Sequence, residues 1–164
     1  IARKRGDVDE AERLQKASLA IYREIGDPQG ESNSLNNLGI IADIRGDYDE
    51  AERLQKASLV IKREIGDRHG EATSLNNLGL ISDIRGDYGE AKRLFEASLT
   101  IKREIGDRRG ESTSLNNLGL IARKKGDYDE AERLFAASQA IRLELGLPIE
   151  EDNEDDDDWF IVKK

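Results

Sequence analysis

One six-residue motif recurs at a fixed spacing of forty residues. Ser-Leu-Asn-Asn-Leu-Gly occupies residues 34–39, 74–79 and 114–119. A regular spacing of this length is typical of repeat proteins, in which one supersecondary unit stacks on the next. Each unit contacts only its neighbours, and stacking creates extended surfaces that bind partners. We therefore expect an array whose function lies on the surface made by stacking.

Each repeat contains two helical segments separated by Gly-Asp pairs such as Gly46-Asp47 and Gly66-Asp67. Glycine ends a helix in the left-handed conformation at little cost, and aspartate is favoured near the positive end of the next helix. Apolar residues at helical spacing predict one helix over 49–65 and a second over 71–84. No alternation with period two is present, so β-structure is disfavoured.

The same reading divides the whole chain. It predicts a helix fragment at 1–5, a lone second helix at 9–25, three full helix pairs to about residue 145, and a tail over 147–164. Residues 1–5 read like residues 121–125, so we expect the chain to continue a longer array. Gly79 lies inside a predicted helix, where glycine costs about 1 kcal/mol relative to alanine. A neighbouring helix is therefore expected to approach it closely.

Charge and composition exclude several classes of function. The net charge is −9, but eight acidic residues lie within 150–158 and the repeats are close to neutral, which argues against nucleic-acid binding. No apolar run approaches the roughly 20 residues of a membrane helix. Cysteine is absent, which rules out disulfides and cysteine metal sites and fits a cytoplasmic protein.

Catalytic and cofactor patterns are also missing from the sequence. His69 is the only histidine and falls in a predicted turn, so a histidine-based dyad has no support. The acidic run lacks the spaced Asp and Gly pattern of a calcium loop, and the glycines punctuate helices rather than form a phosphate loop. We expect no enzyme activity, no metal and no cofactor.

The repeat resembles the tetratricopeptide repeat (TPR) in Asn37-Leu38-Gly39, Gly46-Asp47-Tyr48, Ala51 and Leu59, although Ser58 stands where the family usually has alanine. The resemblance covers residues 1–146, with units that start near 30, 70 and 110. The usual unit has 34 residues, and the forty-residue length is more similar to kinesin light chain and cell-polarity adaptor arrays. It implies an all-α fold: a right-handed superhelical solenoid of antiparallel helix pairs, with a concave wall lined by the first helix of each pair.

The resemblance also suggests which asparagines bind. The second Asn of each motif would face the groove and grip the backbone of an extended peptide, because an amide offers both a donor and an acceptor. These residues are Asn37, Asn77 and Asn117. Their neighbours Asn36, Asn76 and Asn116 fit the same clamp or a bracing role equally well. The alternative for all six is that they cap or brace neighbouring backbone.

Further groove positions follow one turn later. They are Ile40, Leu80 and Leu120, then Asp43, Asp83 and Arg123, then Ile44, Ile84 and Lys124. The last row runs apolar, apolar, basic, and Arg3 and Lys4 hold the equivalent places in the first unit. Such a groove suits an acidic peptide with hydrophobic anchors. The alternative is that Ile40, Ile44 and Ile84 belong to the core between helices.

The acidic run is followed by the apolar segment Trp159, Phe160, Ile161 and Val162. This tail could dock in the groove of its own or a neighbouring chain, cap the last helix, stand in for a partner peptide, or make only incidental contacts. The leading hypothesis is thus a protein-interaction module that binds an extended peptide. Its rival is a structural spacer that self-associates through the tail or the exposed first helix.

Overall fold

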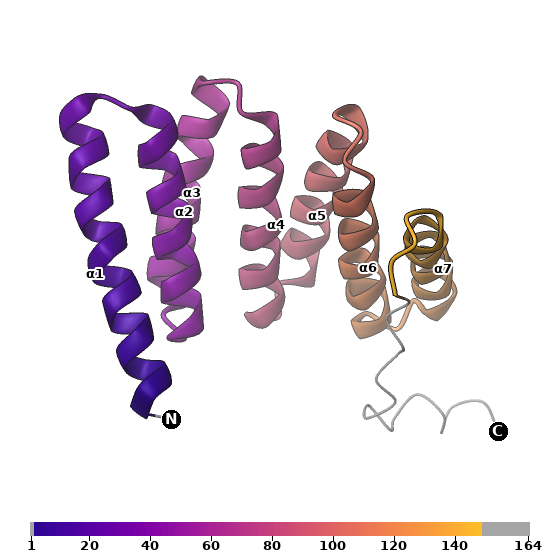
Figure 1. Cartoon of the computed structure of the whole chain (residues 1–164). Helices are drawn as coiled ribbons and strands as arrows, with labels where there is room; N and C mark the ends of the chain where they lie inside the picture. The colour runs from indigo at the N-terminus through magenta and orange to yellow at the C-terminus, as the bar shows by residue number, and fades with distance from the viewer. Residues whose placement is uncertain (1, 149–164) are drawn as a thin grey trace.

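The computed structural model describes residues 2–148, with side chains from residue 6 onward. Within that part the chain forms seven α-helices joined by short turns (Figure 1). They are α1 (Ala2–Ile25), α2 (Pro28–Ile44), α3 (Tyr48–Glu64), α4 (Arg68–Ile84), α5 (Tyr88–Glu104), α6 (Arg108–Lys124) and α7 (Tyr128–Glu144). They pack as sequential antiparallel pairs, which confirms the expected all-α array.

Each turn is built from the Gly-Asp pair that the sequence repeats. Gly66 has a φ of +71°, a left-handed conformation that ends α3. Asp67 then caps α4, because its carboxylate accepts a hydrogen bond from the Gly70 amide at 2.9 Å. The cap places the start of α4 at Arg68, three residues before the predicted start at 71. The predicted turn over 66–70 was too long for this reason.

The predicted break at Gly6-Asp7 is wrong, because α1 runs without interruption from Ala2 to Ile25. Gly6 is not among the glycines with a positive φ. At the other Gly-Asp pairs the chain reverses and the two flanking helices pack together. No preceding helix packs back onto α1 in the described residues, so continuing the helix keeps the backbone hydrogen bonds satisfied.

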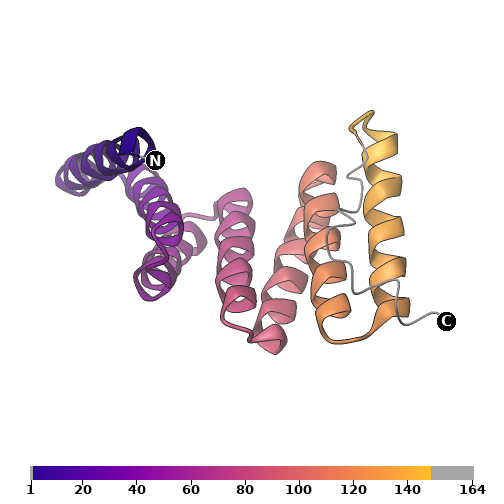
Figure 2. The ribbon, with the colours of Figure 1, turned by 90° about the horizontal axis from the view of Figure 1, so that it is seen from below.

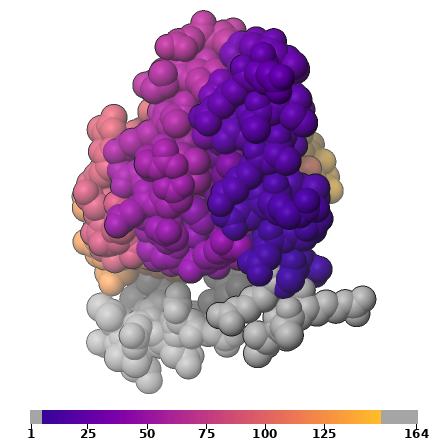
Figure 3. All heavy atoms as spheres, turned by 90° about the vertical axis from the view of Figure 1, so that its left-hand side faces the viewer, coloured from indigo at the N-terminus to yellow at the C-terminus, as the bar shows by residue number. Residues whose placement is uncertain are grey.

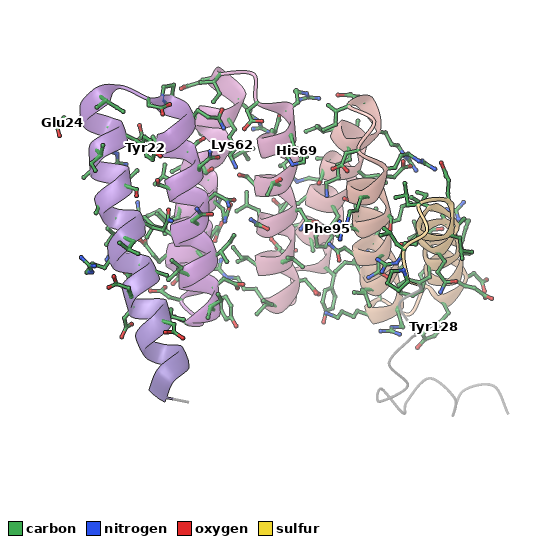
Figure 4. The ribbon with its side chains drawn as sticks, in the orientation of Figure 1. Tyr22, Glu24, Lys62, His69, Phe95 and Tyr128 are labelled. Carbon is green, nitrogen blue, oxygen red and sulfur yellow. The ribbon has the colours of Figure 1, made fainter. Side chains whose placement is uncertain are left out.

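The close approach expected at Gly79 is present inside the α4–α5 pair. A Cβ atom on Gly79 would lie 2.6 Å from Cε1 of Phe95, a ring that is 1% exposed (Figure 4). Phe135 faces Gly119 in the same way, and Gln55 faces Gly39. The glycine of the repeated motif therefore leaves space for one side chain of the following helix, and we call this space the glycine socket.

A buried hydrogen bond explains why serine stands at position 58, where the repeat family usually has alanine. The Ser58 hydroxyl donates to the backbone carbonyl oxygen of Ser32 at 2.8 Å, which joins α3 to α2. Ser98 donates to the carbonyl oxygen of Ala72 in the next pair at the same distance. Because the hydroxyl is paired, burying it costs little. The sequence reading missed this contact, although serine recurs at 18, 58, 98 and 138.

Polar contacts also join one pair to the next. Arg85, which follows α4, binds Asp49 and Glu52 of α3, each at 2.5 Å. The ammonium of Lys62 is buried beside the hydroxyl of Ser74 at 3.4 Å (Figure 4). Burial lowers the pKa of Lys62, and the nearby charge of Asp67 opposes that shift. The consecutive pairs are thus joined by polar contacts as well as by the apolar core.

Candidate functional site

The helices α2, α4 and α6 lie along one face of the row, and α3 and α5 lie along the other (Figures 1 and 2). The three repeated motifs fall on this first group of helices. Positions 37, 40 and 44 are separated by three and four residues, so they share one side of α2. We call the surface formed by these positions on α2, α4 and α6 the asparagine face.

Hydrogen bonds between asparagines join the helices of this face. Nδ2 of Asn77 donates to Oδ1 of Asn36 at 3.2 Å, and Nδ2 of Asn117 donates to Oδ1 of Asn76 at 3.0 Å. The second Asn of the second and third motifs therefore braces the first Asn of the preceding unit. Asn37 instead donates to Oε1 of Gln15 on α1 at 3.3 Å. The sequence reading did not identify Gln15, because its position gave no sign that it reaches α2.

The bracing bonds leave part of each amide without a protein partner. Within residues 6–148, the structure assigns no hydrogen bond to Oδ1 of Asn77 or to Nδ2 of Asn36. Both residues are half-buried, and Asn37 is exposed. A free acceptor and a free donor on the same face match the two groups of a peptide unit. An asparagine at these positions can therefore hold the neighbouring helix and still offer one hydrogen bond to a peptide backbone.

Large apolar side chains stand exposed beside the asparagines. Ile44 is 64% exposed and Ile84 is 52% exposed, and Ile40 and Leu80 are exposed as well. Leu120 is half-buried. These four exposed residues are not in the packed core of the described residues. Their nearest buried neighbours, such as Ile41 and Ile81, fill the core instead.

The charged row changes sign along the asparagine face. Lys124 of α6 donates to both carboxylate oxygens of Asp83 of α4, each at 2.7 Å. Its ammonium also lies 5.8 Å from the centre of the Tyr88 ring, and Arg123 lies 5.7 Å from that of Phe135. Asp43 is half-buried at the α2 end. The face therefore runs from acidic at α2, through the neutralised Asp83–Lys124 pair, to basic at α6.

A small hollow lies between α1, α2 and α3. It has a volume of about 250 Å³ and is bounded by α1, α2 and α3. Its floor is apolar, with Leu35, Leu38 and Ile41, and its rim carries Glu12 and Arg45, which pair with each other at 2.5 Å. Further charged residues line the hollow, among them Lys16 and Arg53, and these are also paired, Lys16 with Glu12 and Arg53 with Glu50.

The other predicted features are His69, the tail segment, and Arg3 with Lys4. His69 is a surface residue whose side chain is 73% exposed, with Nδ1 3.9 Å from the Asp107 carboxylate. The tail segment Trp159, Phe160, Ile161 and Val162, and the acidic run before it, lie outside the described residues. Arg3 and Lys4 lie in α1, but their side chains are not described.

Three further observations bear on the class of the molecule. Among residues 2–148, no helix is long and apolar enough to span a bilayer. The same residues contain no cluster of three or more His, Asp or Glu side chains placed to hold a metal. No curated protein sequence matches the chain.

Several solved structures have a similar fold. BtubC from P. vanneervenii matches with a TM-score of 0.78 and 23% identity over 86% of this chain and 59% of its own. A putative kinesin light chain of Podosopora anserina with nearly identical TPR-like repeats has a TM-score of 0.69 and 20% identity over 86% and 70%. The apo form of RapI has a TM-score of 0.79 and 20% identity over 85% and 51%. The chain thus spans between half and about seven tenths of the length of these relatives.

A family model gives the assignment. The tetratricopeptide repeat model matches residues 1–64, 44–104 and 71–144, so its overlapping matches cover most of the chain. The chain belongs to the tetratricopeptide repeat family, whose arrays are typically non-catalytic and generally serve as protein–protein interaction modules.

Proposed function

We propose that the asparagine face binds an extended peptide that carries hydrophobic anchors and, toward one end, acidic residues. One observation carries the proposal: exposed apolar side chains lie beside asparagine amides that use only one of their two polar atoms within the protein. The exposed residues are Ile40, Ile44, Leu80 and Ile84. Burying apolar side chains stabilises a complex by about 25 cal/mol per Å² of apolar area. The amides add hydrogen bonds to the peptide backbone that do not depend on the peptide's side chains.

The charge gradient orients the peptide. Its acidic residues belong at the α6 end, near Arg123, because Asp43 would repel them at the α2 end and Lys124 is paired with Asp83. Its apolar residues belong over α2 and α4, where the exposed isoleucines lie. The chain's own segment 150–164 has this composition, with an acidic run before Trp159 to Val162. We propose it as one occupant, from the same or a neighbouring chain.

The test uses a chain that ends at residue 148 and a labelled peptide of residues 150–164. Fluorescence anisotropy is expected to show saturable binding. Ile84→Ala should weaken it about tenfold, because the lost burial of one aliphatic side chain is worth roughly 1.5 kcal/mol. The matched control is Val60→Ala on α3, an aliphatic residue that is 54% exposed but lies outside the asparagine face.

Asn77→Ala tests the clamp in the same assay. It should weaken binding of the peptide without changing the helical circular dichroism signal, because the bracing bond it removes is partly exposed. Unchanged affinity in both Ile84→Ala and Asn77→Ala would remove the asparagine face as the site. A panel of unrelated acidic, aromatic-containing peptides then separates a general preference from recognition of the tail alone.

A further inference from the structure

The ammonium of Lys124 is held by two residues of the preceding unit. Its Nζ donates to both carboxylate oxygens of Asp83 on α4, each at 2.7 Å, and lies 5.8 Å from the centre of the Tyr88 ring at the start of α5. The Asp83 side chain is only 16% exposed, so the lysine neutralises a largely covered carboxylate. One carboxylate and one aromatic ring thus hold a lysine beside the asparagine face.

The same two groups recur one unit earlier, without the lysine. Asp43 and Tyr48 lie forty residues before that carboxylate and that ring, and both are half-buried. The residue that corresponds to Lys124 is Ile84, which is 52% exposed. Within residues 6–148, no hydrogen bond or ion pair is assigned to the Asp43 carboxylate. The two units therefore differ in whether the chain itself supplies a cation.

The stacking of the units places Ile84 beside Asp43. Seen along the row from the α1 end, the units lie one behind another (Figure 3). The asparagine bonds of both steps, α2 to α4 and α4 to α6, join residues 41 apart, and the Lys124–Asp83 pair has the same separation. Ile84 also follows Asp43 by 41 residues. Because isoleucine carries no charge, the described part of the chain gives Asp43 no cation.

One segment of this chain carries its charges in the order that suits the asparagine face. The acidic run ends at Asp158, apolar residues follow over 159–162, and Lys163 and Lys164 come next. With Asp158 near Arg123 on α6, the apolar residues would lie over α4 and the lysines would reach α2. Neighbouring helices lie about 10 Å apart and an extended residue spans about 3.3 Å, so roughly six residues cover two helix steps. Lys164 lies six residues after Asp158.

We propose that Asp43 and Tyr48 form a subsite for a lysine side chain of the peptide that binds the asparagine face. The ammonium of that lysine donates to the Asp43 carboxylate and faces the Tyr48 ring, as Lys124 does one unit later. Its aliphatic stem packs on Ile84. The inference rests on the proposed function and adds a basic residue to the peptide at the α2 end, opposite the acidic residues at the α6 end.

The test measures, by fluorescence anisotropy, how tightly two labelled peptides bind the full chain. One peptide is residues 150–164, and the other carries Lys163→Gln and Lys164→Gln. Every chain also carries Trp159→Asp and Ile161→Asp, which weaken its own copy of the segment as a competitor. The peptide with both lysines is expected to bind about three- to fivefold more tightly, which is the effect of one partly exposed ion pair.

Three variants of the chain locate the source of that preference. In Asp43→Asn the two peptides should bind equally, because the carboxylate is gone. In Ile84→Lys they should also bind equally, since the new side chain neutralises Asp43 from α4, as Lys124 neutralises Asp83 from α6. The matched control is Glu64→Gln, which removes one charge from an exposed residue of α3 outside the asparagine face and should keep the preference.

The outcomes separate the subsite from peptide binding as such. Equal binding of the two peptides to the chain that retains Asp43, or a preference that persists in Asp43→Asn, would overturn the subsite. In both cases peptide binding by the asparagine face still stands. Absence of binding by either peptide to any of the chains would overturn the subsite and the proposed tail ligand together.

Discussion

The α2–α3 and α4–α5 pairs have the same backbone design but different side chains at their centres. In both, a glycine of one helix faces a side chain of the next that is 1% exposed. That side chain is Gln55 in the first pair and Phe95 in the second. Nε2 of Gln55 is bonded, but its Oε1 is buried with no partner among the described residues. The comparison teaches that glycine sets the spacing of the helices, whereas the facing side chain sets the stability of the pair.

Truncating the two facing side chains should give the largest difference between the pairs. Phe95→Ala is expected to lower the free energy of unfolding by about 3–5 kcal/mol, because it leaves a cavity in the core. Gln55→Ala should cost about 1 kcal/mol, since the lost contacts are offset by removal of an unpaired buried oxygen. Urea denaturation followed by circular dichroism measures both. Equal losses would show that the two side chains contribute alike.

Filling the two glycine sockets should give an intermediate difference. Gly79→Ala is expected to destabilise by about 1–3 kcal/mol, because the buried Phe95 ring must move from its place in the core. In Gly39→Ala the contact is the amide end of Gln55, which can rotate away. There the clash should nearly cancel the helix-propensity gain of about 1 kcal/mol. The same denaturation series decides, and a larger loss for Gly39→Ala would contradict this account.

Making the first pair resemble the second should give the smallest effect, of opposite sign. Gln55→Phe is expected to raise the free energy of unfolding by about 1–2 kcal/mol, because it buries apolar surface and removes the unpaired oxygen. The reverse change, Phe95→Gln, serves as the control and should destabilise. If Gln55→Phe lowers the denaturation midpoint, the space around Gly39 differs from that around Gly79 despite the shared backbone.

The candidate site was predicted only in part, for a physical reason. The resemblance to tetratricopeptide repeats pointed to Asn37, Asn77, Ile44 and Ile84 as groove residues, and helical spacing puts the Asn and the Ile of each helix on the same side. It did not reveal that Asn77 binds Asn36, because this bond depends on the distance between α4 and α2. The pairing of Lys124 with Asp83 likewise depends on how the units are stacked. Peptide binding by this face stays a prediction.

The sequence by itself determined the array and its repeated helices, although it misplaced the start of α4 and the division of α1. Regular Gly-Asp turns, apolar spacing and the repeated glycine are local signals, and local geometry translates them directly into structure. Tertiary structure decided which of the repeated side chains are buried. Residues 9–19 and 49–59 are identical, yet Leu54 is buried by α2 while Leu14 is exposed. The physical reason is that burial requires two surfaces in contact, so identical residues differ when, among residues 2–148, another helix covers only one of them.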